Sequence, residues 1–144
     1  MKRYLLCELN DENYTGAFFR IFNILSSATN TAILDCIDEY CGNCQVETND
    51  LRITSSRGDS FYVAEIKEFE EHDGPHLLVW HHAYEGVGFE VRFQGSYKQC
   101  KMEMEREMEM VLNEYHLPDE AKRFDNVIDT GNEWEVWDIV EIGV

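Results

Sequence analysis

Residues 76–93 read HLLVWHHAYEGVGFEVRF, two apolar runs separated by a turn that contains two glycines. The first run, 76–84, is almost continuously apolar and aromatic, which is typical of a central strand. In the second run, 89–93, apolar and charged residues alternate, so the apolar side chains are expected to share the inward face. Two further runs with a period of two, 51–54 and 61–69, precede this pair. The middle of the chain is therefore predicted to be an antiparallel meander of four strands.

Three segments around the meander have the apolar spacing of amphipathic helices. Thr15 is expected to cap the first helix, and Gly42 follows the end of the second. Ser96 and Gln99 fit a capping box at the start of the third. The expected buried stripes are Phe18, Ile21, Phe22 and Leu25 in the first helix, Ile33, Leu34, Ile37, Tyr40 and Cys41 in the second, and Tyr97, Cys100, Met104, Met108, Val111 and Tyr115 in the third.

Two terminal strands, 2–9 and 134–142, complete the predicted sheet, and a short helical turn is expected over 121–127. The predicted fold class is α+β: an antiparallel sheet, made of the meander and the terminal strands, with two N-terminal helices and one long helix packed on one face. A length of 144 residues without a Pro-rich or Gly-rich linker predicts a single domain over 1–144. No internal repeat is evident in the sequence.

The chain carries 29 acidic against 12 basic residues, a formal net charge of −17. This excess argues against direct binding of nucleic acid, which requires a basic surface, and against binding of an anionic membrane. Two interpretations of the charge stay open. It keeps the protein soluble, or it is directed at a cationic partner.

Five cysteines, an odd number without the spacing of a disulfide framework, predict a cytoplasmic protein. The apolar stretch at the N-terminus is too short for a secretory signal. Cys36, Cys41 and Cys44 have the spacing of the first three ligands of plant-type ferredoxins, but no fourth cysteine lies nearby. Cys41 and Cys44 form one zinc knuckle where a strong zinc signature has two, so they are weak metal candidates. We therefore expect no metal and no cofactor.

His81 and His82 are adjacent in a predicted strand, so their side chains are expected on opposite faces and not in one site. His82 shares a face with Trp80 and Tyr84, where a pocket with a working histidine is one interpretation. The sequence contains no nucleotide-binding, serine-hydrolase or metalloprotease motif. We therefore expect no catalytic residue, and a small zinc- or histidine-dependent enzyme is only the third alternative.

Carboxylates gather in three segments: the predicted long helix, the strand and loop near residue 70, and the C-terminal region. Like charges one helical turn apart cost roughly a few tenths of a kcal/mol per pair, which points to a role other than helix stability. Merged on folding, these carboxylates would have a spacing near that of nucleic-acid phosphates. The expected partner-binding residues are Glu103, Glu105, Glu107, Glu109, Glu68, Glu70, Glu71 and Asp73, and the expected apolar anchors are Met102, Met110, Trp134 and Trp137.

In size, acidity and lack of motifs, the whole chain resembles the small acidic proteins that phages and mobile elements carry against host defences, including anti-CRISPR and anti-restriction proteins. This resemblance implies a non-enzymatic inhibitor that mimics nucleic acid and binds the basic surface of a Cas effector nuclease or a restriction enzyme. The alternative is a generic acidic α+β interaction module with another protein partner. Whether the protein forms a homodimer is left open.

Overall fold

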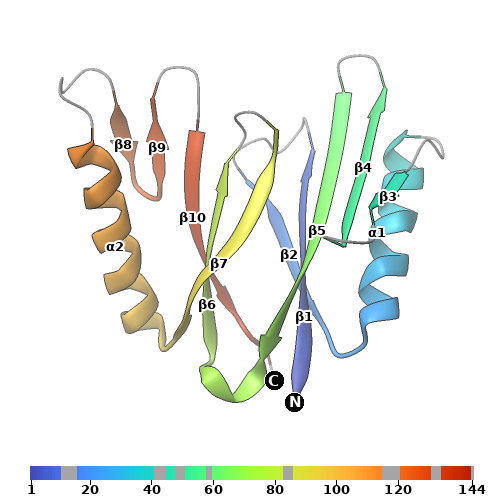
Figure 1. Ribbon diagram of the computed structural model, residues 1–144, viewed down its shortest axis with the longest axis horizontal. Helices are drawn as coiled ribbons and strands as arrows, with labels where there is room; N and C mark the ends of the chain where they lie inside the picture. The colour runs from blue at the N-terminus through green and yellow to red at the C-terminus, as the bar shows by residue number, and fades with distance from the viewer. Residues whose placement is uncertain are drawn as a thin grey trace. The chain divides into compact units, whose positions relative to one another are not determined.

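The computed structural model describes residues 1–10, 16–40, 45–47, 51–57, 60–82, 86–114, 121–130 and 134–143. The chain forms two compact units, Met1–Glu71 (unit 1) and His72–Val144 (unit 2), which are drawn in Figure 1. Whether they behave as the single domain expected over 1–144 stays a prediction. None of the helices in the described part of the chain is long and apolar enough to cross a membrane.

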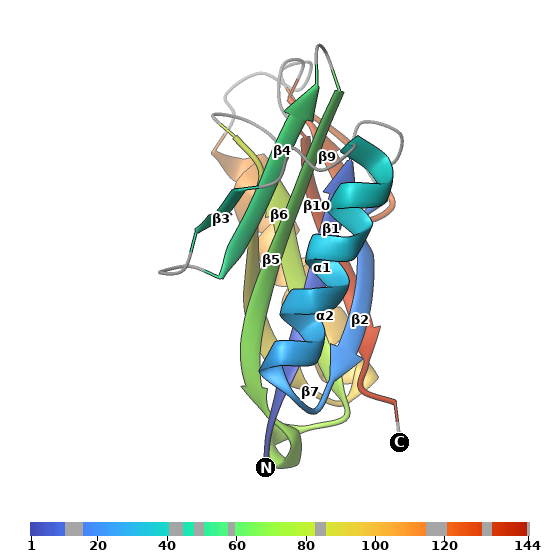
Figure 2. The same cartoon turned by 90° about the vertical axis from the view of Figure 1, so that its right-hand side faces the viewer.

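Unit 1 is a five-stranded antiparallel sheet with one helix. Its strands lie in the order β2-β1-β5-β4-β3, and β1 pairs with β5 over its whole length, with Leu6 opposite Ile66. Figure 2 shows α1 along one face of this sheet. The elements in chain order are β1 (Lys2–Asn10), β2 (Phe18–Phe22), α1 (Leu25–Tyr40), β3 (Gln45–Glu47), β4 (Arg52–Arg57) and β5 (Ser60–Glu70).

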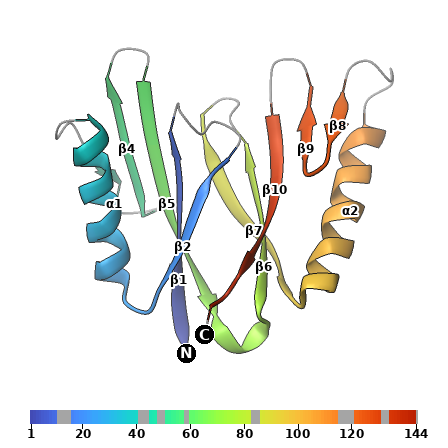
Figure 3. The ribbon, with the colours of Figure 1, turned by 180° about the vertical axis from the view of Figure 1, so that it is seen from behind.

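Unit 2, which follows the short 3-10 helix η1 (Glu71–Asp73), is also a five-stranded antiparallel sheet with one helix. Its strands lie in the order β7-β6-β10-β9-β8, with Leu78 of β6 opposite Ile139 of β10. Figure 3 shows α2 alongside this sheet, next to the β8–β9 hairpin. The elements are β6 (His76–His82), β7 (Gly88–Gly95), α2 (Tyr97–Asn113), β8 (Lys122–Phe124), β9 (Val127–Asp129) and β10 (Trp134–Glu141).

The two units repeat one architecture. Each runs strand, strand, helix and then three strands, and the two sheets have the same strand order. The fully or almost fully buried residues of the two helices lie 72 positions apart in the chain. The sequence conceals this repeat because matched positions hold different residue types. The matched helix residues are Ala28, Ala32 and Cys36 in unit 1 and Cys100, Met104 and Met108 in unit 2.

The predicted fold class was wrong. The strands do not form one sheet under three helices; they form two antiparallel sheets with one helix each. The local pairings of the meander are confirmed, because β4 pairs with β5 and β6 pairs with β7. The meander nevertheless breaks between β5 and β6, because β5 pairs with β1 and β6 pairs with β10. Alternation within a strand shows which face is buried but not which distant strand it will join.

The predicted first helix was also wrong, because Phe18–Phe22 forms the edge strand β2. Its apolar residues fit a helical spacing, but a short apolar run is ambiguous, and the aromatic and β-branched sequence FFRIF favours a strand. The helix begins at Leu25 and contains most of the predicted second helix. Thr15 and Gly42, the expected boundary residues, lie outside the described residues.

Small side chains attach α1 to its sheet. Ala28, Ala32 and Cys36 are fully buried, whereas Leu34 and Ile37 of the predicted stripe are 61% and 42% exposed. A spacing of four residues places the three small side chains on one side of the helix. The prediction followed the larger apolar residues; it was wrong for Leu34 and Ile37, whereas Ile33 does pack against the core.

The start of α2 and most of its buried face are as the sequence predicted. The Gln99 amide N–H donates to Ser96 Oγ at 3.1 Å and the Ser96 amide N–H donates to Gln99 Oε1 at 2.9 Å, which confirms the capping box. Tyr97, expected in the stripe, is 56% exposed instead. The buried residues of the helix are Cys100, Met104 and Met108.

Residues 121–127, expected to form a helical turn, instead contain most of the β8–β9 hairpin. The two-residue loop begins at Asp125, whose φ of 54° is the positive value that such loops need at their first position. Asn126 follows, and its backbone carbonyl accepts a hydrogen bond from the Trp137 amide at 2.9 Å. Aspartate and asparagine tolerate positive φ, so this turn had a sequence signal that the helical reading overlooked.

A β-bulge in β7 overturns the predicted alternation of that strand. Phe93 lies opposite Leu78 on the face that carries α2, whereas Phe89 lies opposite His81 on the other face. Arg92 is the extra residue at the bulge. Because an extra residue inverts the direction of the side chains beyond it, the two phenylalanines do not share the inward face.

Candidate functional site

The glutamates of α2 are balanced by cations of unit 2. Glu103 pairs with Arg106, and Glu105 accepts two hydrogen bonds from Arg123, each at 2.7 Å. These hydrogen bonds from arginine lower the pKa of the Glu103 and Glu105 carboxyls. Across residues 97–113 there are four glutamates and three Lys or Arg residues, a formal charge of only −1. The helix is therefore not a uniformly anionic surface.

The other two glutamates of α2 differ in exposure. Glu107 is half-buried, accepts a hydrogen bond from Trp137 Nε1 at 3.4 Å and lies 3.5 Å from Arg92 Nε. Glu109 is exposed, and no described residue forms an ion pair with it. Glu107 thus has contacts within unit 2, whereas Glu109 is open to a partner.

The second predicted set of carboxylates lies around the end of β5. These four acids are exposed or half-exposed; the three glutamates form ion pairs, and Asp73 Oδ1 lies 3.3 Å from His72 Nε2. Exposed ion pairs contribute only about 0–1 kcal/mol, so they leave the carboxylates available to another cation. In unit 1, Glu68 pairs with Lys2, Glu70 with the N-terminal amine and Glu71 with Arg3; in unit 2, Asp73 lies next to His72.

Three of the four predicted apolar anchors are exposed, as contact with a partner requires. Met102 is 64% exposed, Met110 53% and Trp134 37%. Trp137 is only 1% exposed and packs in the core of unit 2, so its prediction as an anchor was wrong. Sequence alone does not distinguish these tryptophans because both lie in one strand, three residues apart.

The cysteines do not form a metal site within the part of the chain that the structure describes. Cys36 is disulfide-bonded, and the weak zinc candidates Cys41 and Cys44 lie outside the described residues. Cys7 and Cys100 are free thiols, and burial raises the pKa of both. Among described residues, no group of three or more His, Cys, Asp or Glu side chains is placed to hold a metal ion.

The two adjacent histidines lie on opposite faces of β6, as predicted. His81 is 1% exposed, and its Nε2 lies 2.8 Å from Asp138 Oδ2. The His82 ring lies 4.6 Å from the Trp80 ring, on the face that carries α2. Tyr84, expected beside them, is outside the described residues.

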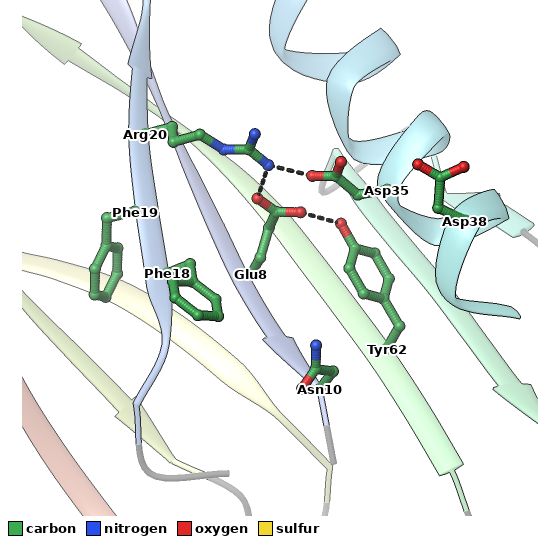
Figure 4. A pocket seen from close by; sticks show the side chains of 8 residues that line it. All are labelled: Glu8, Asn10, Phe18, Phe19, Arg20, Asp35, Asp38 and Tyr62. Atoms are coloured by element: carbon green, nitrogen blue, oxygen red, sulfur yellow. Dashed lines mark hydrogen bonds and ion pairs between the residues drawn. The ribbon is translucent and has the colours of Figure 1, made fainter. Parts of the chain in front are cut away.

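Unit 1 contains a polar pocket that no sequence motif indicated (Figure 4). Its volume is about 380 Å³. Glu8, only 6% exposed, accepts a hydrogen bond from the Tyr62 hydroxyl at 2.5 Å. The Arg20 guanidinium bridges Glu8 to Asp35 of α1. The lining residues are Glu8, Asn10, Phe18, Phe19, Arg20, Asp35, Asp38 and Tyr62.

Burial dominates the electrostatics of this pocket. It raises the pKa of the Glu8 carboxyl, and the hydrogen bond with Asp35 raises it further, against the opposing effects of Tyr62 and Arg20. Burial and the neighbouring Glu8 also raise the pKa of Tyr62. Tyr62 is therefore a neutral hydrogen-bond donor and not a base.

The sequence contained one weak signal for this pocket. Glu8 is the one charged residue within the apolar strand run YLLCEL, at residues 4–9. Its partners Arg20, Asp35 and Tyr62 come from β2, α1 and β5, far apart in the chain. No local spacing connects such residues, and only the pairing of β1 with β2 and β5 brings them together.

Unit 2 has a pocket of about 410 Å³ on the α2 side of its sheet. The bulge residue Arg92 lies 4.3 Å above the centre of the Trp80 ring, a cation–π contact. Arg106, paired with Glu103, also has its Nη1 3.0 Å from Met110 Sδ. The lining residues are Trp80, Arg92, Glu103, Arg106, Glu107, Met110, Val111, Glu114, Glu135 and Trp137.

Compared with protein-family models, curated proteins and solved structures, the chain gives no match. Its function is therefore inferred from the residues described above.

Proposed function

We propose that this protein is a non-enzymatic, acidic inhibitor that binds the basic, nucleic-acid-binding surface of a partner protein. The observation that carries the proposal is the exposure of apolar anchors beside carboxylates on α2, in a chain with a net charge of −17. Met102 and Met110 are both more than half exposed, and Glu109, whose carboxylate pairs with no described residue, is adjacent in sequence to Met110. Interfaces derive most of their affinity from a few apolar or aromatic anchors, and charge adds steering and specificity.

The near-neutral charge of α2 changes how the nucleic-acid mimicry would work. With four glutamates against three cations, the helix alone resembles a phosphate backbone poorly. The long-range attraction would come from the whole chain, because unit 1 has 13 acids against six bases and unit 2 has 16 against six. α2 would then supply the short-range contacts through its methionines and Glu109.

The concrete partner class is a Cas effector nuclease or a restriction enzyme, whose nucleic-acid channels are rich in Lys and Arg. The first experiment is capture of partners from a nuclease-treated lysate, with elution by heparin. Elution of a basic nuclease supports the proposal. Recovery of only non-basic proteins supports the generic interaction module instead.

Variants of α2 then test the surface itself. We expect Met102→Ala with Met110→Ala to weaken binding roughly fivefold or more, because anchors typically contribute at least about 1 kcal/mol. Glu109→Lys is expected to weaken binding most at low salt, since screening grows with ionic strength. Asn30→Lys, at an exposed position of α1, is the control for added positive charge. Equal affinity of all these variants would remove α2 from the interface.

Action in the cytoplasm is part of the proposal, and Cys36 provides its test. Disulfides persist mainly in oxidising compartments, whereas the structure has Cys36 in a disulfide. The disulfide therefore weighs against this location, and alkylation of thiols in intact cells, followed by mass spectrometry, decides: a reduced Cys36 supports the cytoplasmic location. An oxidised Cys36 in freshly quenched cells would contradict the cytoplasmic location.

A further inference from the structure

We propose that the pocket of unit 1 binds the guanidinium group of an arginine side chain from a partner protein. The inference rests on the proposed function for the existence of a basic partner, and it names the chemical group that the partner would insert. The ligand site is formed by Asp35 and Asp38 on α1 and by the exposed Phe18 on β2, all three of which line the pocket.

The charges of the lining residues are unbalanced. Glu8, Asp35 and Asp38 supply three carboxylates, and Arg20 is the one Lys or Arg among the lining residues. Both oxygens of Glu8 are used, by Arg20 and Tyr62. Arg20 binds only Oδ2 of Asp35. No described cation pairs with the Asp38 carboxylate, which Figure 4 shows beside Asp35 on the same helix.

Asp38, together with Asp35, which already binds Arg20 and Glu8, presents carboxylates that suit a planar cation. Residues three apart on a helix are neighbours, with Cβ atoms roughly 5–6 Å apart, so Asp35 and Asp38 present carboxylates side by side. A guanidinium group has five donors in a flat fork and binds carboxylates in pairs. Phe18 is 60% exposed and lines the pocket, where its ring is available for a cation–π contact.

Unit 2 gives an internal example of how this groove accommodates guanidinium groups. Its pocket contains two arginines, Arg92 above the Trp80 ring and Arg106 on the helix paired with Glu103. The lining thus combines an aromatic ring, helix carboxylates and guanidinium groups from its own chain. At the matched positions unit 1 has Glu8 in place of Trp80 and Thr31 in place of Glu103. Its own ring is Phe18, its carboxylates are Glu8, Asp35 and Asp38, and it has one guanidinium fewer.

The matched helix positions show which cation is missing. With the 72-residue offset, Asp35 corresponds to Glu107, and Leu34 corresponds to Arg106. Unit 1 therefore has an apolar residue where unit 2 has its helix arginine. It also has the carboxylate of Asp38 where unit 2 has Met110. A guanidinium from outside would contact Asp38, the counterpart of the Met110 that Arg106 contacts in unit 2.

The surroundings of the pocket favour an arginine within a polypeptide over a free amino acid. Phe18 is 60% exposed and Leu34, adjacent to Asp35 on α1, is 61% exposed. Apolar surface of this kind contacts the residues that flank an inserted side chain, and free arginine has no such residues. The proposal therefore commits to a side chain of a partner protein.

The test is an NMR titration of the full chain with Nα-acetyl-arginine amide, which has a guanidinium but no backbone charge. We expect saturable shifts at the amides of β1, β2 and the second half of α1. Nα-acetyl-norleucine amide, of similar shape without the charge, is expected to give none. Free arginine is expected to bind more weakly, and tighter binding of free arginine would overturn the assignment to a partner side chain.

Three variants locate the site. Asp38→Asn is expected to weaken binding of the arginine amide by about three- to tenfold, the usual effect of removing a charge-assisted hydrogen bond at a partly exposed site. Leu34→Arg is expected to abolish binding, because Asp38 lies four residues further along α1, where the new guanidinium would pair with it. Ile37→Arg adds the same charge on α1 directly before Asp38, where the two side chains do not face each other, and it is expected to leave binding almost unchanged.

The outcomes separate this proposal from the function proposed above. Binding that survives Leu34→Arg, or that Ile37→Arg abolishes equally, overturns the site. Binding of arginine amide with the expected variant pattern, but no capture of a basic protein from lysate, supports the site and contradicts the inhibitor function. Capture that Leu34→Arg weakens and Ile37→Arg does not supports both.

Discussion

Unit 1 and unit 2 have the same architecture but fill the space between helix and sheet differently. In the last strand of each unit, β5 and β10, Ala64 and Trp137 are at equivalent positions. Ala64 lies two residues before Ile66, and Trp137 lies two residues before Ile139. In the helices, alanines of unit 1 correspond to Cys100 and a methionine of unit 2. Unit 1 thus has small side chains and a polar network, whereas unit 2 has an aromatic ring and long flexible side chains.

The first strands differ in the same way. Glu8 in unit 1 lies two residues after Leu6, and Trp80 in unit 2 lies two residues after the equivalent Leu78. Around Glu8 the space is occupied by Arg20 and Tyr62, and around Trp80 by Arg92. The comparison teaches that strand pairing and the placement of apolar faces determine the architecture, whereas the volume and polarity of single core residues are free to vary.

The largest expected effect tests whether unit 2 depends on its aromatic core. Trp137→Ala should lower the free energy of unfolding by about 3–5 kcal/mol, because it removes a buried ring and leaves a cavity. Urea denaturation measures this, with Trp134→Ala as the control three residues away, at 37% exposure. Similar losses for the two variants would mean that Trp137 does not have the structural role assigned to it.

The next effect tests the polar network of unit 1. Tyr62→Phe removes the hydroxyl that donates to Glu8 at 2.5 Å and leaves a buried carboxylate with one donor fewer. Loss of such a partner typically costs about 1–3 kcal/mol. Denaturation of Tyr62→Phe alone and in combination with Glu8→Gln measures the coupling, which should be large because the two groups share one hydrogen bond. Additive effects would show that the contact contributes little.

The stability that Glu8 contributes is also expected to depend on pH, and comparison with Glu8→Gln measures this dependence. Because burial raises the pKa of Glu8 in the folded state, the folded protein binds more protons than the unfolded chain between the two pKa values. The contribution of Glu8 to stability is then largest below the ordinary glutamate pKa of about 4.3 and is lost as the pH rises through the raised value. The stability of the wild type relative to Glu8→Gln should therefore fall as pH increases. A rise over this range would show that the ion pair with Arg20 dominates instead.

The smallest effect concerns the surface of unit 2. Glu105→Gln removes the ion pair with Arg123 and should cost about 0.2–1 kcal/mol at neutral pH. Because Arg123 lowers the pKa of Glu105, this contribution is present above the ordinary glutamate pKa and is lost as the pH falls through the lowered value. Glu109→Gln, at a position without a described ion pair, is the control and should leave stability unchanged. Equal effects of both variants would indicate general charge repulsion rather than a specific pair.

The sequence predicted local features best where the signal was local. The capping box of Ser96 and Gln99 and the opposite directions of His81 and His82 are both confirmed. The alternation and turn signals also identified the strands on either side of residue 86. Each of these features depends on residues within a few positions of each other.

The sequence failed where one residue type allowed two interpretations. Phe18–Phe22 fitted both a helix and a strand, and pairing with β1 decided for the strand. In α1, the larger Leu34 and Ile37 looked buried, but the small residues on the other side of the helix face the sheet. Neither outcome follows from local spacing, because the partner element determines which face is covered.

By itself, the sequence determined the charge of −17, the start of α2 and most of the strands, because composition, caps and alternation are properties of neighbouring residues. Only the tertiary structure decided that the chain repeats one architecture twice and that Glu8, Arg20, Asp35 and Tyr62 share a pocket. These features depend on which distant strands pair. Once β1 pairs with both β2 and β5, the register brings together side chains up to 54 positions apart in the chain.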